Sequence, residues 1–113
     1  MTFPNYQECM KPILEFASEC KQDFFRLDPV NNIAKLFKLS EEEEKQRIPS
    51  DAFTVLESRV GWAVTYLYKS GLLERTGRGR YKITDIGKEF NKKNKTINTN
   101  DLKKIKQFSD WFS

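Results

Sequence analysis

Histidine is absent from the 113 residues of this chain, and its absence excludes several kinds of site. Ser-His-Asp and Cys-His catalysis, zinc bound by histidine and a histidine pH switch are all ruled out. The longest apolar run is far shorter than the roughly 20 residues that a membrane span requires, and the N-terminus shows no signal-peptide pattern. We therefore expect one compact domain in the cytoplasm, without membrane contact.

Cysteine is scarce as well, because the chain has only Cys9 and Cys20. Both belong to a series of apolar residues with the spacing of a buried helix face. Eleven residues of helix separate the two thiols by about 16 Å, too far for a disulfide, and no CxxC motif is present. We expect reduced thiols, as in a cytoplasmic protein. The series consists of Tyr6, Cys9, Met10, Ile13, Leu14, Ala17 and Cys20.

Charge is unevenly distributed along the chain. The total of +4 is modest, but residues 1–51 carry seven basic and ten acidic side chains, whereas residues 52–113 carry thirteen and six. A basic second half favours a polyanionic partner. The alternative is a lysine-rich surface that only contacts water.

Capping residues, turn residues and apolar spacing together predict the order of the elements. We expect residues 1–93 to form the main domain, 94–100 a polar linker and 101–113 an additional amphipathic helix. The first predicted elements are a helix at 6–20, an extended piece at 24–27, a helix from Pro29 with Asp28 as N-cap, and a short helix capped by Ser40 and Glu43. A long helix at 51–70, capped by Ser50, comes next. It is followed by strands at 72–76 and 80–83 around a glycine-flanked turn and by helices at 85–93 (capped by Thr84) and 101–112.

The long helix at 51–70 has two distinct faces. Trp62 falls opposite the apolar stripe, which is unusual for an amphipathic helix. Either the first helix, the C-terminal helix or a dimer partner covers Trp62, or its ring contacts a base methyl or an extruded base. Because tryptophan is mostly buried on average, we favour the covered, structural interpretation. The predicted core-facing residues are Phe53, Leu56, Val60, Ala63, Val64 and Leu67.

This order of elements predicts a mainly α (α+β) winged helix-turn-helix with a two-stranded wing hairpin and an extra C-terminal helix. The helix at 51–70 would be the recognition helix, and the hairpin around residues 77–79 the wing. A helix that fits the major groove then directly precedes a basic hairpin that reaches the adjacent backbone.

Several segments resemble the N-terminal domain of Mrr-type restriction system proteins. The most specific is RVGWAVTYL at 59–67; the others are YQE at 6–8, MKPIL at 10–14, LSEEE at 39–43, RIPS at 47–50, KSGLLER at 69–75 and RGRYKIT at 78–84. The resemblance implies a winged-helix DNA-binding module, usually tethered to a PD-(D/E)xK endonuclease that cuts methylated DNA. Glu43-Glu44-Lys45 spells ExK, but within a capped helix, and no Pro-Asp pair exists. We therefore expect no enzymatic activity in this chain.

The candidate DNA-binding residues form two groups. Hydroxyl side chains and an arginine near the start of the long helix suit phosphate and base-edge contacts in the major groove, with Trp62 on the same helix. Cations of the hairpin suit phosphate contacts. The alternatives are capping and solvated surface, with Arg59 paired to Glu57 or Asp85. The two groups are Ser50, Thr54, Ser58, Arg59 and Trp62, and Arg75, Arg78, Arg80 and Lys82.

The expected partners are double-stranded DNA, methylated if the resemblance extends to modification sensing, and a nuclease domain in cis or in trans. No cofactor or metal is expected. A competing hypothesis is an interaction module that dimerises or recruits a protein through the helix at 102–112 and the Trp62 face. A small stand-alone transcriptional regulator would share the DNA chemistry.

Overall fold

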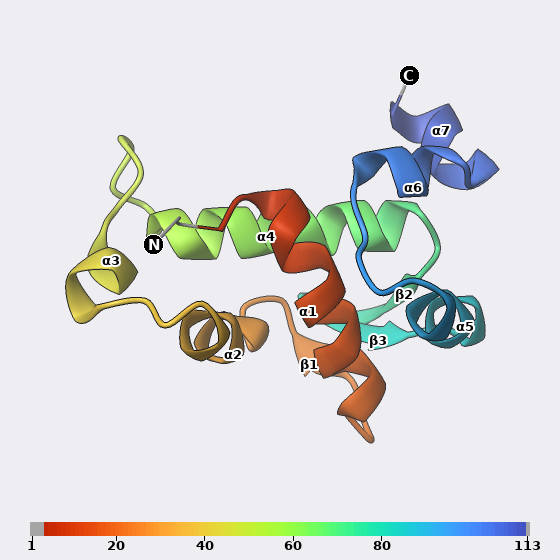
Figure 1. Ribbon diagram of the computed structural model, residues 1–113, viewed down its shortest axis with the longest axis horizontal. Coiled ribbons are helices and arrows are strands. Elements are labelled where there is room, and N and C mark those ends of the chain that lie inside the picture. The colour runs from red at the N-terminus through yellow and green to blue at the C-terminus, as the bar shows by residue number, and fades with distance from the viewer. Residues whose placement is uncertain (1–3, 113) are drawn as a thin grey trace.

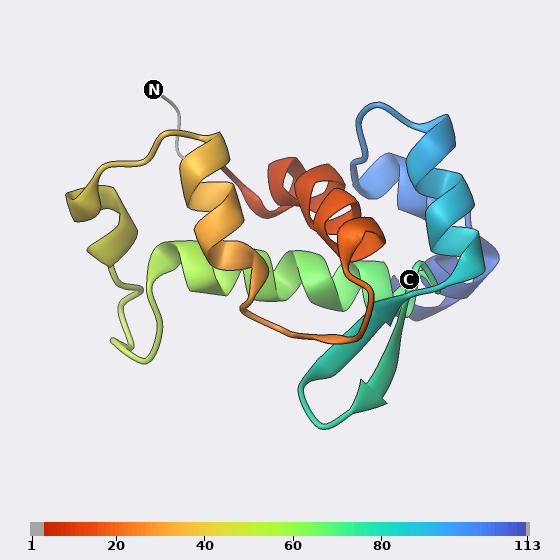
Figure 2. The same cartoon turned by 90° about the horizontal axis from the view of Figure 1, so that it is seen from below.

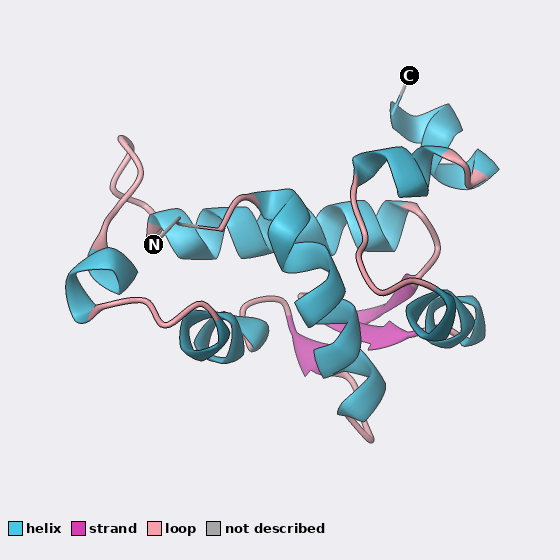
Figure 3. Ribbon diagram, in the orientation of Figure 1, coloured by secondary structure: helices cyan, strands magenta, loops and turns pink. Residues whose placement is uncertain are grey.

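The computed structural model describes residues 4–112 and combines helices with one small antiparallel sheet (Figures 1 and 3). The sheet has three strands in the order β1-β3-β2. A mixed α+β architecture is therefore confirmed. The elements are α1 (Tyr6–Glu19), β1 (Phe24–Phe25), α2 (Pro29–Leu36), α3 (Glu41–Lys45), α4 (Val55–Lys69), β2 (Leu73–Gly77), β3 (Arg80–Ile83), α5 (Asp85–Lys93), α6 (Thr99–Lys103) and α7 (Lys106–Phe112).

The core lies where α1 crosses α4 (Figure 1). The predicted apolar stripe of α1 is confirmed, and both cysteines are free. Each fully buried aliphatic side chain contributes about 1.5–3 kcal/mol to folding, so this crossing is the main source of stability. The residues buried here are Cys9, Met10, Ile13, Leu14 and Ala17 of α1, and Leu56, Val60, Ala63, Val64 and Leu67 of α4.

The predicted hairpin is confirmed as β2 and β3, and β1 adds a third strand to it. Phe24 pairs with Tyr81 and Phe25 with Arg80. The register between β2 and β3 shifts between Arg75 and Gly77. Gly79 in the turn has φ +72°, a conformation that glycine adopts without strain.

The start of α4 differs from the prediction. Thr54, not Ser50, is the N-cap, and it forms a capping box with Glu57. Asp51 has φ +61°, which ends any helix at that residue, and a backbone bridge between Arg47 and Thr54 closes the preceding loop. Phe53 therefore lies outside the helix and is 49% exposed, so its assignment to the core was wrong.

Other predicted caps have mixed outcomes. Ser40 and Glu43 form the expected capping box, and Thr84 caps α5 through the amide of Gly87. Asp28, however, makes no side-chain cap for α2. Its carboxylate instead accepts a hydrogen bond from the amide of Phe25 (2.8 Å), which fixes the turn between β1 and α2.

The segment after α5 packs on the rest of the domain. Two helices, α6 and α7, take the place of the one predicted at 101–112, and the break lies between Lys103 and Lys106. A capping box of Asn98 and Asp101 begins α6 at Thr99, two residues before the predicted start. Ile97 and Thr99 are buried. The amide of Thr99 donates to the side chain of Gln7 in α1 (2.9 Å).

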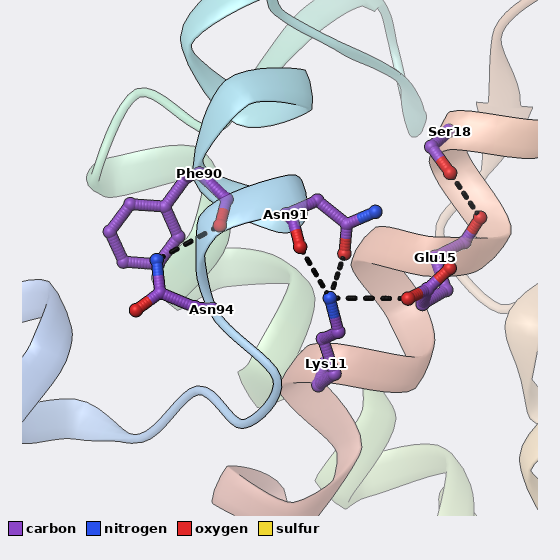
Figure 4. A network of polar contacts seen from close by, with 6 residues as sticks. All are labelled: Lys11, Glu15, Ser18, Phe90, Asn91 and Asn94. Atoms are coloured by element: carbon purple, nitrogen blue, oxygen red, sulfur yellow. Dashed lines mark hydrogen bonds and ion pairs between the residues drawn. The ribbon is translucent and has the colours of Figure 1, made fainter.

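A half-buried lysine connects α1 to α5 (Figure 4). The ammonium group of Lys11 donates to the backbone carbonyl and to the side-chain oxygen of Asn91, each at 2.6 Å. It also forms an ion pair with Glu15 (3.1 Å). Hydrogen bonds from a charged donor are stronger than neutral ones, so this contact fixes the helix that directly follows the hairpin.

Candidate nucleic-acid interface

A stripe of α4 opposite α1 is partly open to solvent, with Trp62 exposed and the other members half-buried. Ser58, Trp62, Thr65 and Lys69 follow one another along it at intervals of three or four residues. The Trp62 ring is 55% exposed and makes an edge contact with Tyr66. The interpretation that helices of this chain cover Trp62 was therefore wrong.

A cavity of about 320 Å³ adjoins this stripe. An arginine fixes one side of it: Arg26 Nη2 donates to the carbonyl of Gly61 (2.6 Å) and Nη1 to the hydroxyl of Tyr81 (3.4 Å). The guanidinium thus joins α4 to the sheet. The cavity is lined by Arg26, Leu27, Phe53, Glu57, Ser58, Gly61 and Trp62.

The hairpin extends past α4 on the side that α1 and α2 leave uncovered (Figure 2). Its four predicted cations are all exposed. Arg80 and Lys82 are two residues apart on β3 and share one face of the sheet, and Arg80 lies over the ring of Phe25 (5.4 Å). Arg75 pairs with Tyr81 and so lies on the opposite face, while Arg78 is in the turn.

The predicted residues of the long helix do not all share this surface. Ser58 lines the cavity beside Trp62. Ser50 is exposed in the loop before α4, and the Thr54 hydroxyl already accepts from the amide of Glu57 (3.0 Å). Arg59 Nη1 donates to the carbonyl of Pro4 (3.0 Å), so its guanidinium is directed toward the beginning of α1.

Sequence reasoning missed Phe25, Arg26 and Phe53 in this surface. Arg26 and Phe25 reach it because β1 pairs with β3, and Phe53 because the chain turns at Asp51. The strand pairing leaves no local pattern, whereas the turn does: Pro49 is its second residue, and the amide of Asp51 donates to the carbonyl of Ile48 (2.9 Å). The position of Lys69, in contrast, follows from its helical spacing to Trp62.

The cysteines are not arranged for catalysis. Burial, reinforced by the nearby Glu8 carboxylate, raises the pKa of the Cys9 thiol to about 12, although Arg59 partly opposes this. Burial also raises the pKa of Cys20. Within residues 4–112, no group of three or more Cys, Asp or Glu side chains is placed to hold a metal ion. None of the helices described there is long and apolar enough to cross a membrane.

These differences predict ordered thiol reactivity. Cys20 is half-buried and Cys9 fully buried, and only the thiolate reacts with alkylating agents. Iodoacetamide at mildly alkaline pH should therefore add one group to the native protein, at Cys20, and a second only after unfolding in urea. Peptide mass spectrometry gives the positions; equal modification of Cys9 in the native state would contradict the packing of α1 on α4.

Comparison with known families identifies the family to which the chain belongs. The sequence model of the Mrr N-terminal domain family matches residues 6–93, from the start of α1 to the end of α5. No nuclease family is matched. No curated protein and no solved structure matches the chain. The matched segment covers most of the sequence, and the chain therefore belongs to the Mrr N-terminal domain family, whose members are modules of restriction systems.

Proposed function

We propose that this chain is the DNA-binding module of a modification-dependent restriction system and that its fold is a winged helix-turn-helix. Helices α1, α2 and α4 followed by the β2–β3 hairpin, with β1 completing the sheet, have the order expected of that fold. In this proposal α4 enters the major groove and the hairpin is the wing. The nuclease acts on the same DNA from another domain or another chain.

The observation that supports the proposal best is the common direction of two features. The exposed stripe of α4 lies opposite α1, and the hairpin tip extends on that same side (Figure 2). The major groove is about 12 Å wide and accepts one helix, and a cationic hairpin beside that helix meets the bordering phosphates. A solvated surface requires no such arrangement.

In the proposed complex each candidate residue has its own role. Ser58 and Trp62 face the bases, with Ser50 and Thr54 at the groove edge and Arg59 on the flank toward α1. Methyl groups on adenine N6 or cytosine C5 lie in the major groove, where the Trp62 ring and the neighbouring cavity offer an apolar contact. Arg75, Arg78, Arg80 and Lys82 contact phosphates.

A salt titration tests the proposal. Each phosphate contact contributes about 0.9 to the slope of log K against log salt. The double variant Arg78→Ala/Arg80→Ala should therefore bind a labelled duplex with a slope about 1.8 smaller than that of the original protein, measured by fluorescence anisotropy between about 50 and 200 mM salt.

The matched control is Lys35→Ala/Lys92→Ala, which removes the same charge from exposed positions. Helix α2 and the end of α5 lie on the side of α4 opposite the hairpin tip (Figure 2), so the control slope should not change. Equal slopes for the hairpin variant and the original protein would refute the wing contact. Equal affinity for methylated and unmethylated duplexes of one sequence would refute modification sensing.

A further inference from the structure

Helices α6 and α7 lie beyond the segment matched to the family, yet they are a fixed part of the molecule. Leu102 and Phe108 are fully buried. Tyr66 of α4 contacts three rings of α7, those of Phe108, Trp111 and Phe112, at centroid distances of 5.5 to 5.9 Å. These helices therefore have a defined position relative to the exposed stripe of α4.

That position is the flank opposite the sheet. Figure 1 shows α6 and α7 on one side of the C-terminal half of α4 and the strands on the other. Contacts of α4 give the same arrangement. The carbonyl of Gly61 accepts a hydrogen bond from Arg26, which follows β1, whereas Tyr66 contacts α7. The two residues lie about 140° apart around the helix axis. Trp62 and Lys69 lie between these two flanks.

The flank made by α6 and α7 is cationic and partly aromatic. Lys69 lies over the Trp111 ring (5.7 Å) and Lys103 over the Phe112 ring (4.9 Å). Trp111 and Phe112 are each 40% exposed. Lys103, Lys104 and Lys106 are exposed as well. They outnumber the two acidic residues of these helices, which are the exposed Asp110 and Asp101, whose carboxylate accepts a hydrogen bond from the amide of Asn98 (3.0 Å).

We infer that α6 and α7 form a second phosphate-binding flank of the DNA interface. A helix in the major groove has a phosphate strand on each side. The hairpin arginines serve one strand; Lys103 and Lys106 serve the other, and the exposed rings of Trp111 and Phe112 pack against its sugars. This inference rests on the proposed DNA binding by α4 and adds contacts from a segment outside the family match.

The test compares two double variants with equal charge loss. Lys103→Gln/Lys106→Gln should reduce the slope of log K against log salt by about 1.8 and weaken binding about tenfold at low salt. Lys35→Gln/Lys92→Gln should leave both quantities unchanged. Circular dichroism checks that each variant is folded, and both pairs replace exposed side chains.

The possible outcomes separate the two hypotheses. If the original protein binds no duplex, the proposed function fails. If it binds, and Arg78→Ala/Arg80→Ala flattens the slope while Lys103→Gln/Lys106→Gln does not, only the second flank is refuted. Sedimentation that shows a dimer lost on Trp111→Ala, together with an unchanged slope for the Lys103 and Lys106 variant, would instead assign this surface to self-association.

Discussion

Replacing Gly87 with alanine should lower the free energy of unfolding by about 3 kcal/mol, at the upper end of what overpacking costs. A Cβ at this position would overlap the carbonyl oxygen of Leu72 and lie 2.8 Å from Cγ1 of Ile83. The Leu72 carbonyl has little freedom to move, because it accepts hydrogen bonds from both the amide and the hydroxyl of Thr84 (3.1 Å each). Thr84 in turn caps α5.

Urea denaturation followed by circular dichroism measures this loss. Gly77→Ala is the matched control: a Cβ there meets only Cδ of Arg80, at the ordinary contact distance of 3.6 Å, so the change should stay within about 0.5 kcal/mol. Equal stability of the two variants would show that α5 packs less closely on the strands. Because α5 directly follows β3, the same contact sets where the hairpin lies relative to α4.

Local sequence patterns predicted the parts of the fold that depend on a few neighbouring residues. The apolar spacing of α1, the Ser40–Glu43 capping box, the Thr84 cap and the glycine turn of the hairpin were all confirmed. In each case the partners are within a few residues of one another, so the sequence alone contains the interaction.

Features that depend on tertiary structure were not predictable in this way. Asp51 takes a positive φ within the loop closed by the Arg47–Thr54 bridge. Aspartate adopts this conformation more readily than most residues, but the bridge that closes the loop joins residues seven apart and has no sequence signature. The Arg26 contact with Gly61 joins segments 35 residues apart. It positions one side of the cavity beside Trp62. This part of the candidate site therefore could not be predicted from the sequence.

The candidate DNA-binding residues differ in the same way: those of the hairpin follow from local sequence, whereas those of the helix depend on where α4 begins. The hairpin cations were named from a turn and a charge cluster, and the structure shows them exposed. The helix residues were assigned by assuming that α4 begins at residue 51. Because it begins at Val55, Thr54 is a cap and Ser50 a loop residue, and the center of the exposed stripe moves to Ser58, Trp62 and Lys69.

Phe108→Ala should cost about 3–5 kcal/mol, the range for truncation of a fully buried phenylalanine. Besides Tyr66, its ring contacts Phe112 (stacked, 5.3 Å) and Trp111 (5.7 Å). Such aromatic pairs stabilise the fold beyond what the burial of their surface contributes. If α7 were an appendage on a polar linker, the loss would be small. Thermal and urea unfolding measure it, with Phe25→Ala as control because that ring is 55% exposed.

This variant also separates packing from charge at the second flank. Phe108→Ala keeps Lys103 and Lys106 but removes one of the three α7 rings that contact Tyr66, so at a temperature where the protein remains folded Lys106 of α7 is held less firmly and the salt slope should fall by up to about 0.9, the contribution of one phosphate contact. A phosphate contact is effective only when the lysine is held at the strand, since an unrestrained side chain loses entropy on binding. An unchanged slope in a folded Phe108→Ala protein would mean that Lys106 acts without the packing of α7 on Tyr66, and a rigid contribution of α7 to the second flank would be excluded.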